Sequence, residues 1–138
     1  MSDNRIREAA VGDLDQVISI WKSCDLVKPQ NDPVADFELA LNTKDSTILI
    51  LQSGTSLIGA VVVGFDGHRG WYYYLGISPD HQNAGNGRLL VEAAEDWLLS
   101  RGAPKAMLMV RNSNSKVIGF YEKLGYTVEE TSVLGKRL

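Results

Sequence analysis

Residues 82–87 read Gln-Asn-Ala-Gly-Asn-Gly, a composition typical of a turn that binds an anion. The run follows an aromatic stretch and precedes apolar residues at helical spacing, so several backbone N–H groups would lack helical partners. Glycines let a ligand approach this backbone closely, and the dipole of the following helix favours negative charge. The sequence therefore predicts a phosphate-binding turn formed by Gln82, Asn83, Ala84, Gly85, Asn86 and Gly87, with Arg88 as an added cation or a solvated helical residue.

Two other phosphate motifs do not fit this turn. A dinucleotide-binding G-x-G-x-x-G follows the first strand, but here the motif lies in mid-chain and Leu90 replaces its third glycine. A P-loop needs Lys after its last glycine, and Arg88 follows Gly87. Nucleotide-dependent transfer is therefore disfavoured.

Hydrophobic periodicity predicts the elements that must position this turn. A short strand surrounds Ile6, a helix begins after Asp13, and Asp32 with Pro33 starts a second helix. Helices are also expected after residue 87 and over 114–123. Further strands are expected at 47–51, 57–65, 71–77, 106–110, 126–129 and 133–138. The order predicts one α/β domain over residues 1–138, with a mixed sheet covered by helices.

A second motif gives the turn its context. Asn114, Val117, Tyr121, Gly125 and Tyr126 have the spacing Asn-x-x-Ala-x-x-x-Tyr-x-x-x-Gly-Phe/Tyr, with Val for Ala. Together with the Gly-rich turn, this pattern resembles the GNAT superfamily of N-acetyltransferases over nearly the whole chain. Residues 24–26 and 66–70 are similar to its YpeA-like bacterial branch. The resemblance implies a mostly antiparallel twisted sheet of about seven strands, four helices and a splayed strand pair that binds acetyl-CoA.

The resemblance also implies how acetyl-CoA, the acetyl donor, is held. Its pyrophosphate would lie on the backbone of residues 82–88. Its pantetheine arm would pair with the strand edge at Leu75, Gly76 and Ile77, whose N–H groups would also stabilise the oxyanion. Asn114 is a helix cap, a pantetheine contact or both, and Phe120 would complete the coenzyme site.

Tyr121 matches the family's tyrosine that protonates the departing sulfur, and the alternative is a core aromatic residue. No acid occupies residues 71–75, so the general base stays open: a water chain, Asp66, His68 or Asp25, or no base if the amine arrives neutral. Tyr72 and Tyr74 are expected on one face of their strand, with Tyr73 on the other.

Four residues are candidates for the acceptor cleft: Asp25, Asp32, His68 and Arg69. The acids would attract a cationic amine, whereas Arg69 would favour a carboxylate. Cys24 is a candidate nucleophile, but packing is the better interpretation because no histidine is placed beside it. One Cys and two scattered His do not form a metal site.

Composition limits the partners. The formal net charge is −3 and the longest basic run is Lys136-Arg137, so we do not expect nucleic-acid binding. No apolar run is long enough to span a membrane, and residues 1–4 are too polar for a secretory signal. The expectation is a cytoplasmic enzyme, with a homodimer possible, that acetylates a small-molecule or peptide primary amine by direct attack. The alternative is a non-catalytic acyl-CoA-binding or regulatory module.

Overall fold

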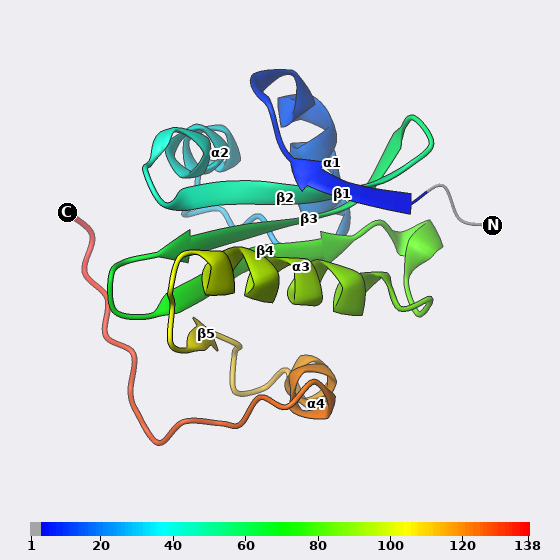
Figure 1. The fold of residues 1–138 in the computed structure, drawn as a ribbon. Coiled ribbons are helices and arrows are strands. Elements are labelled where there is room, and N and C mark those ends of the chain that lie inside the picture. Colours follow the sequence, from blue (N-terminus) through cyan, green and yellow to red (C-terminus); the bar gives the residue numbers. More distant parts are fainter. Residues whose placement is uncertain (1–3) are drawn as a thin grey trace.

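The computed structural model describes residues 4–138, so the polar residues 1–3 lie outside the described part of the chain. Five strands and four α-helices follow one another along it (Figure 1). They are β1 Asn4–Glu8, α1 Leu14–Ser23, α2 Pro33–Asn42, β2 Ser46–Ser53, β3 Ser56–Phe65, β4 Gly70–Ile77, α3 Asn86–Ser100, β5 Ala106–Leu108 and α4 Ser115–Lys123, with single 3-10 turns at Val11–Asp13 and Pro79–His81.

Local sequence signals fix the first two helices. In α1, buried Val17, Ile18 and Trp21 recur at the predicted helical spacing. Helix α2 begins as predicted, because the Asp32 carboxylate accepts hydrogen bonds from Val34 N and Ala35 N at 3.1 and 3.2 Å.

The sheet has the order β1-β2-β3-β4-β5. Strands β1 to β4 are antiparallel neighbours, whereas β5 is parallel to β4 and is reached through α3. Helices α1 and α2 cover one face of the sheet, and α3 covers the other with α4 beside it (Figure 1). Each face has its own core cluster, one with Trp21 and Phe37 and the other with Leu90 and Tyr121. This confirms the predicted α/β fold class.

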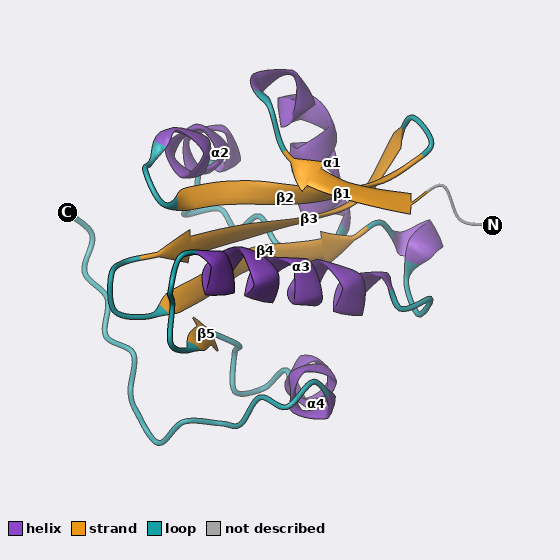
Figure 2. Ribbon diagram, in the orientation of Figure 1, coloured by secondary structure: helices purple, strands orange, loops and turns teal. Residues whose placement is uncertain are grey.

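The prediction of two closing strands is wrong. After α4 the chain has no regular secondary structure (Figure 2), and the described sheet has five strands where about seven were expected. Val133 and Leu134 are 70% and 90% exposed, so this segment buries too little apolar surface to offset the entropy of ordering a strand. Polar contacts tether it instead: Lys105 pairs with Glu129, and Arg137 donates to the Gln30 carbonyl.

Candidate active site

The predicted splay lies between β4 and β5. Their ladder pairs only three residues of each strand and ends at Tyr72 and Leu108. Ser78 N donates to Ile58 O of β3 at 2.8 Å. In an antiparallel pair, neighbouring residues direct their N–H and C=O groups to opposite sides, so the backbone groups of Ile77 lie on the side away from β3. The Ile77 carbonyl is already bonded, by Cys24 Sγ at 3.1 Å and Gln82 Nε2 at 2.9 Å. Its N–H therefore lies on the open side of β4.

A bulge interrupts β4 next to this opening. On β3, Ala60 pairs with Gly76 of β4, and the next pair is Val62 with Tyr73. Two residues of β4, Tyr74 and Leu75, therefore lie opposite the single β3 residue Val61. Tyr74 has φ +56°, an uncommon conformation for a bulky residue. Its ring stacks on Trp21 at a centroid distance of 4.3 Å, and its hydroxyl donates to Asp36 Oδ2 at 2.6 Å. These two contacts hold the strained bulge in place.

The bulge also corrects the predicted alternation of the three tyrosines. Tyr72 packs in the core cluster under α3 and α4, whereas Tyr74 packs in the cluster under α1 and α2. Because the extra residue breaks the period of two, Tyr73 and Tyr74 line the same face of the sheet.

The Gly-rich turn forms the concave backbone that the sequence predicts. Asn83 and Gly85 have φ values of +62° and +82°, and alternating conformations of this kind turn successive N–H groups toward one point. The first bond of α3 runs from Leu89 N to Gly85 O. Within residues 4–138, the N–H groups of residues 82–88 donate no backbone hydrogen bond, so they are available to an anionic ligand.

The side chains of this turn have mainly structural partners. Asn86 is buried and donates to His81 O at 2.9 Å, which explains a polar residue at this position. Arg88 is exposed and pairs with Glu92 one helical turn later, at 2.8 Å. Anion binding by this turn would therefore rest on its backbone, with Arg88 as a peripheral charge.

Helix α4 lies against the turn through Phe120. A Cβ on Gly87 would lie 3.2 Å from the Phe120 ring, so the glycine allows α3 and α4 to approach closely. Asn114 is the N-cap of α4 and accepts from Val117 N at 3.3 Å, which is the capping alternative of the prediction.

Tyr121 lies on the buried face of α4, 7% exposed. Its ring makes edge contacts with Phe120 and Tyr126, at centroid distances of 5.0 and 5.6 Å. The Tyr126 hydroxyl lies 2.8 Å from Glu95 Oε2 and 3.0 Å from the Tyr72 hydroxyl. Within the described residues no hydrogen bond engages the Tyr121 hydroxyl, which leaves it able to donate to a ligand.

Burial raises the pKa of each phenol in this cluster. It raises the pKa of Tyr72 to about 12, and it raises the pKa of Tyr121 further, with the neighbouring Tyr72 adding to the shift. The pKa of Tyr126 is raised by burial, by its hydrogen bonds and by Glu95. Tyr121 is therefore fully protonated at neutral pH, as a proton donor must be.

The four predicted acceptor residues do not form one cluster. The Asp25 side chain is 92% exposed and pairs with Lys28, and Asp32 caps α2. His68 and Arg69 lie in the turn before β4, where both backbone N–H groups donate to Asp66 Oδ1. That turn is at the opposite end of β4 from Ile77, and the role of all four in acceptor binding stays a prediction.

Sequence reasoning missed Asp36. It lines a cavity of about 580 Å³ with Tyr73 and Tyr74, between α2 and β4. A second cavity, of about 470 Å³, lies between β5 and α4 on the other side of the sheet and includes Tyr121 and Glu95. No spacing pattern links Asp36 to Tyr74, because 38 residues separate them and only the fold brings them together.

Comparison with known proteins decides the family. The model of the acetyltransferase (GNAT) family matches residues 14–126. This chain belongs to the GNAT acetyltransferase family. An acetyltransferase of Yersinia pestis (strain Pestoides F) is 44% identical over 126 residues, which are 91% of this chain and 89% of that protein. An acetyltransferase of Yersinia enterocolitica is 44% identical over 96% of this chain and 94% of its own.

Solved GNAT enzymes share the fold. An aminoglycoside N-acetyltransferase in complex with CoA superposes with a TM-score of 0.85 at 16% identity, covering 99% of this chain and 96% of its own. Glucosamine-6-phosphate N-acetyltransferase from Arabidopsis thaliana gives 0.76 at 18% identity, with 96% and 97% covered. Because its family model and its relatives are acetyltransferases, this GNAT protein is an N-acetyltransferase. Its YpeA-like branch stays a prediction.

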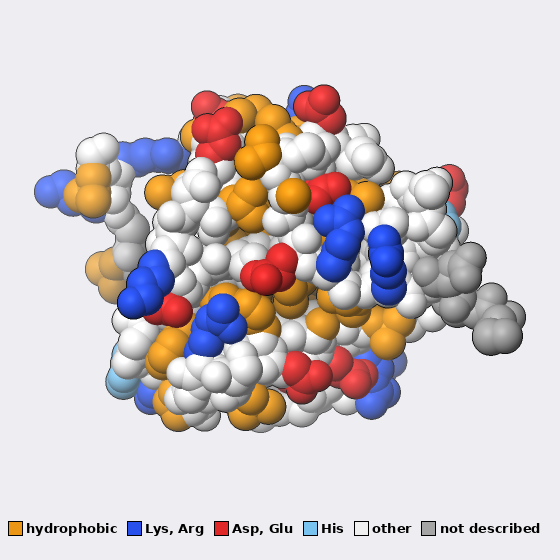
Figure 3. All heavy atoms as spheres, turned by 45° about the horizontal axis from the view of Figure 1, so that its top comes forward, with side chains coloured by type: hydrophobic (Ala, Val, Ile, Leu, Met, Phe, Trp, Pro, Cys, Tyr) orange, Lys and Arg blue, Asp and Glu red, His pale blue; other side chains and the backbone are white. Residues whose placement is uncertain are grey.

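No helix within residues 4–138 is long and apolar enough to cross a membrane. No group of three or more His, Cys, Asp and Glu side chains in the same residues is arranged to hold a metal ion. In Figure 3, Lys and Arg are interspersed with Asp and Glu.

Proposed function

We propose that this GNAT enzyme transfers the acetyl group of acetyl-CoA to a primary amine by direct attack. The observation that carries this proposal is the opening of β4 from β5 after Tyr72, beside the free N–H groups of residues 82–88. The opening offers hydrogen bonds to the amides of pantetheine, and the turn offers them to pyrophosphate. Leu75, Gly76, Ile77, Asn114 and Phe120 belong to this proposed coenzyme site.

The two faces of the sheet supply different groups to the reaction. The amine would approach from the α1–α2 side, where the bulge places Tyr73 and Tyr74. Tyr121 would act from the α3–α4 side. The amine nitrogen bonds to the acetyl carbon, the C–S bond breaks, and the Tyr121 phenol protonates the departing sulfur. The proton that the amine nitrogen loses would pass through water and restore the Tyr121 phenol.

A calorimetric titration with acetyl-CoA, followed by an assay of free thiol with an amine panel, tests the proposal. Binding with amine-dependent thiol release supports it, whereas absence of acetyl-CoA binding by the folded protein overturns it. The alternative of a non-catalytic module predicts binding without turnover, and the enzyme names of the family and its relatives disfavour it. A cytoplasmic location and a homodimer stay predictions, and the single free Cys24 agrees with a reducing compartment.

A further inference from the structure

The cavity between α2 and β4 is lined mainly by apolar and aromatic side chains, with Asn31, Thr43 and Ser46 as uncharged polar residues. Tyr73 and Tyr74 form its β4 side, and Leu26, Leu39 and Ala40 supply much of the rest. Tyr73 is 44% exposed and Leu39 is 71% exposed, so solvent reaches both. The volume of about 580 Å³ is in the range of small-molecule sites.

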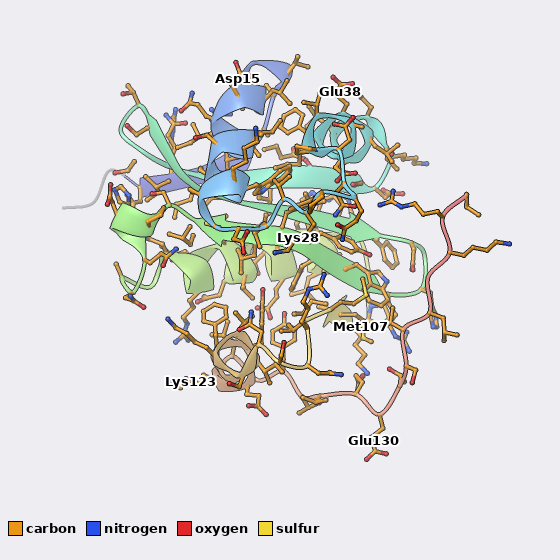
Figure 4. The ribbon with its side chains drawn as sticks, turned by 180° about the vertical axis from the view of Figure 1, so that it is seen from behind. Asp15, Lys28, Glu38, Met107, Lys123 and Glu130 are labelled. Carbon is orange, nitrogen blue, oxygen red and sulfur yellow. The ribbon has the colours of Figure 1, made fainter. Side chains whose placement is uncertain are left out.

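Asp36 is the one charged residue that lines this cavity. The other acids nearby have different positions or partners. Asp32 caps α2, Asp25 pairs with Lys28, and Glu38 projects from the outer side of α2 (Figure 4). The cavity therefore offers a single carboxylate within a mostly apolar and aromatic surface.

We propose that this cavity is the acceptor subsite and that it takes a primary amine with one positive charge, carried on an apolar or aromatic group. This inference rests on the acetyl transfer proposed above. The ammonium binds at Asp36 and faces the Tyr73 and Tyr74 rings, which attract cations. The apolar carrier lies against Leu26 and Leu39. A polyamine is disfavoured, because the lining has no second carboxylate to pair with its further ammonium groups, and Asn31, Thr43 and Ser46 offer only neutral oxygens.

Tyr74 connects this subsite to the donor strand. Its hydroxyl bonds to Asp36 at 2.6 Å, and its backbone forms the bulge next to Leu75. Stacking on buried Trp21 fixes the ring. An amine bound at Asp36 is thus held beside Tyr74, in the part of β4 that has separated from β5, which makes Tyr74 a positioning residue.

The test measures binding of phenethylammonium to the full chain by calorimetry or NMR titration, with spermidine and neutral 2-phenylethanol as comparison ligands. We expect phenethylammonium to bind more tightly than spermidine. Asp36→Asn should weaken phenethylammonium binding about tenfold and leave 2-phenylethanol unchanged, because the amide keeps the shape and can still accept from Tyr74. Glu38→Gln removes the same charge from the outer side of α2 and should change neither.

Equal binding of phenethylammonium to Asp36→Asn and the native protein overturns the subsite, as does tighter binding of spermidine. If Asp36→Asn does not fold, Leu39→Lys replaces it. Position 39 is exposed on α2 and lines the cavity, so both ligands lose an apolar contact, but the added cation should weaken phenethylammonium binding about tenfold more than 2-phenylethanol binding. These measurements need no acetyl-CoA. Failure of the acetyl transfer would appear separately, as loss of acetyl-CoA binding in the native protein.

Discussion

The proposed donor and acceptor sides of β4 offer different kinds of chemical group to their ligands. On the donor side, the free N–H groups of residues 82–88 and the open edge at Ile77 are backbone groups. On the acceptor side, the cavity offers the side chains of Asp36, Tyr73 and Tyr74. Backbone recognition depends on conformation and therefore requires glycine at fixed spacings, whereas side-chain recognition can be assembled from distant residues. One enzyme can thus keep its donor site while its acceptor site changes.

This difference predicts that the functions separate in experiments. A change in residues 82–88 should alter the affinity for acetyl-CoA, a change at Asp36 should alter the affinity for the amine, and a change at Tyr121 should alter the chemical step. A single variant that changed the acetyl-CoA affinity, the amine affinity and the rate of the chemical step together would show that the two sides of β4 are not independent.

The largest effect is expected for Tyr121→Phe. The substitution keeps the ring and its edge contacts with Phe120 and Tyr126 but removes the proton. A positioned general acid contributes about 10²–10⁴-fold in rate, so kcat should fall by that factor with acetyl-CoA affinity nearly constant. Single-turnover measurement is the check, because slow product release would hide part of the loss.

Tyr126→Phe is the matched control for Tyr121. It removes the hydroxyl that lies between Glu95 and Tyr72 while leaving the ring against Tyr121. We expect a much smaller loss of rate, on the order of a few-fold. A folded Tyr121→Phe enzyme with the native single-turnover rate would make Tyr121 a core aromatic residue only.

The next effect tests the donor side at Gly85. Its φ of +82° disfavours a β-branched residue, while a Cβ there would meet no protein atom within 4 Å. Gly85→Val should therefore strain the turn and crowd the ligand, weakening acetyl-CoA binding by about 10- to 100-fold, or about 1.4–2.7 kcal/mol. Calorimetry measures it, with circular dichroism to confirm that the helices remain.

Gly85→Asn provides the comparison for that loss. Asn83 already adopts positive φ in the same turn, so Asn at 85 adds bulk with less strain and should bind more tightly than the Val variant. Native affinity in folded Gly85→Val would show that residues 82–88 are not the coenzyme site.

A smaller effect is expected for Arg88→Ala. Because Arg88 is exposed and paired with Glu92, its charge is largely compensated, and binding of acetyl-CoA should weaken only about two- to threefold at low salt. Glu92→Gln releases the guanidinium and should strengthen binding by a similar factor. A tenfold loss in Arg88→Ala would instead mean a direct bond to phosphate.

Most of the fold was predictable because its signals are local. The Asp32 cap, the stripe of α1 and the Gly-rich entry to α3 each lie within a few residues. The closing segment was not predictable in this way. Alternating apolar residues at 126–138 resemble strands, but a strand also needs an edge to pair with, and β5 offers only three residues.

The donor side and the acceptor side differ in the same respect. The predicted coenzyme residues belong to two motifs and to the strand before the first one, and the fold brings residues 75–77, the turn at 82–88 and Phe120 together. Asp36 lies in a helix without any special spacing, and its importance arises from the hydrogen bond to Tyr74 and from the bulge that turns Tyr74 toward it. The bulge is stabilised by the contacts of Tyr74 with Trp21 and Asp36, which are distant in sequence. The regular alternation of strand residues does not include such a bulge, so it placed Tyr74 on the wrong face of the sheet.

The smallest expected effect is the pH dependence that Tyr121 itself contributes. Comparing native enzyme with Tyr121→Phe separates this contribution from that of the other titrating groups. Burial raises the pKa of this phenol above its ordinary value of 10.0, so the proton is present at neutral pH and is lost only as pH rises through the raised value. Native kcat can still rise with pH as the acceptor amine loses its proton, but Tyr121→Phe shares that rise. The ratio of native to Tyr121→Phe single-turnover rates should therefore stay constant from about pH 7 to 10 and fall only above that range. A ratio that declines between pH 7 and 9 would mean that the titrating donor is another group, because a buried phenol beside Tyr72 does not ionise there.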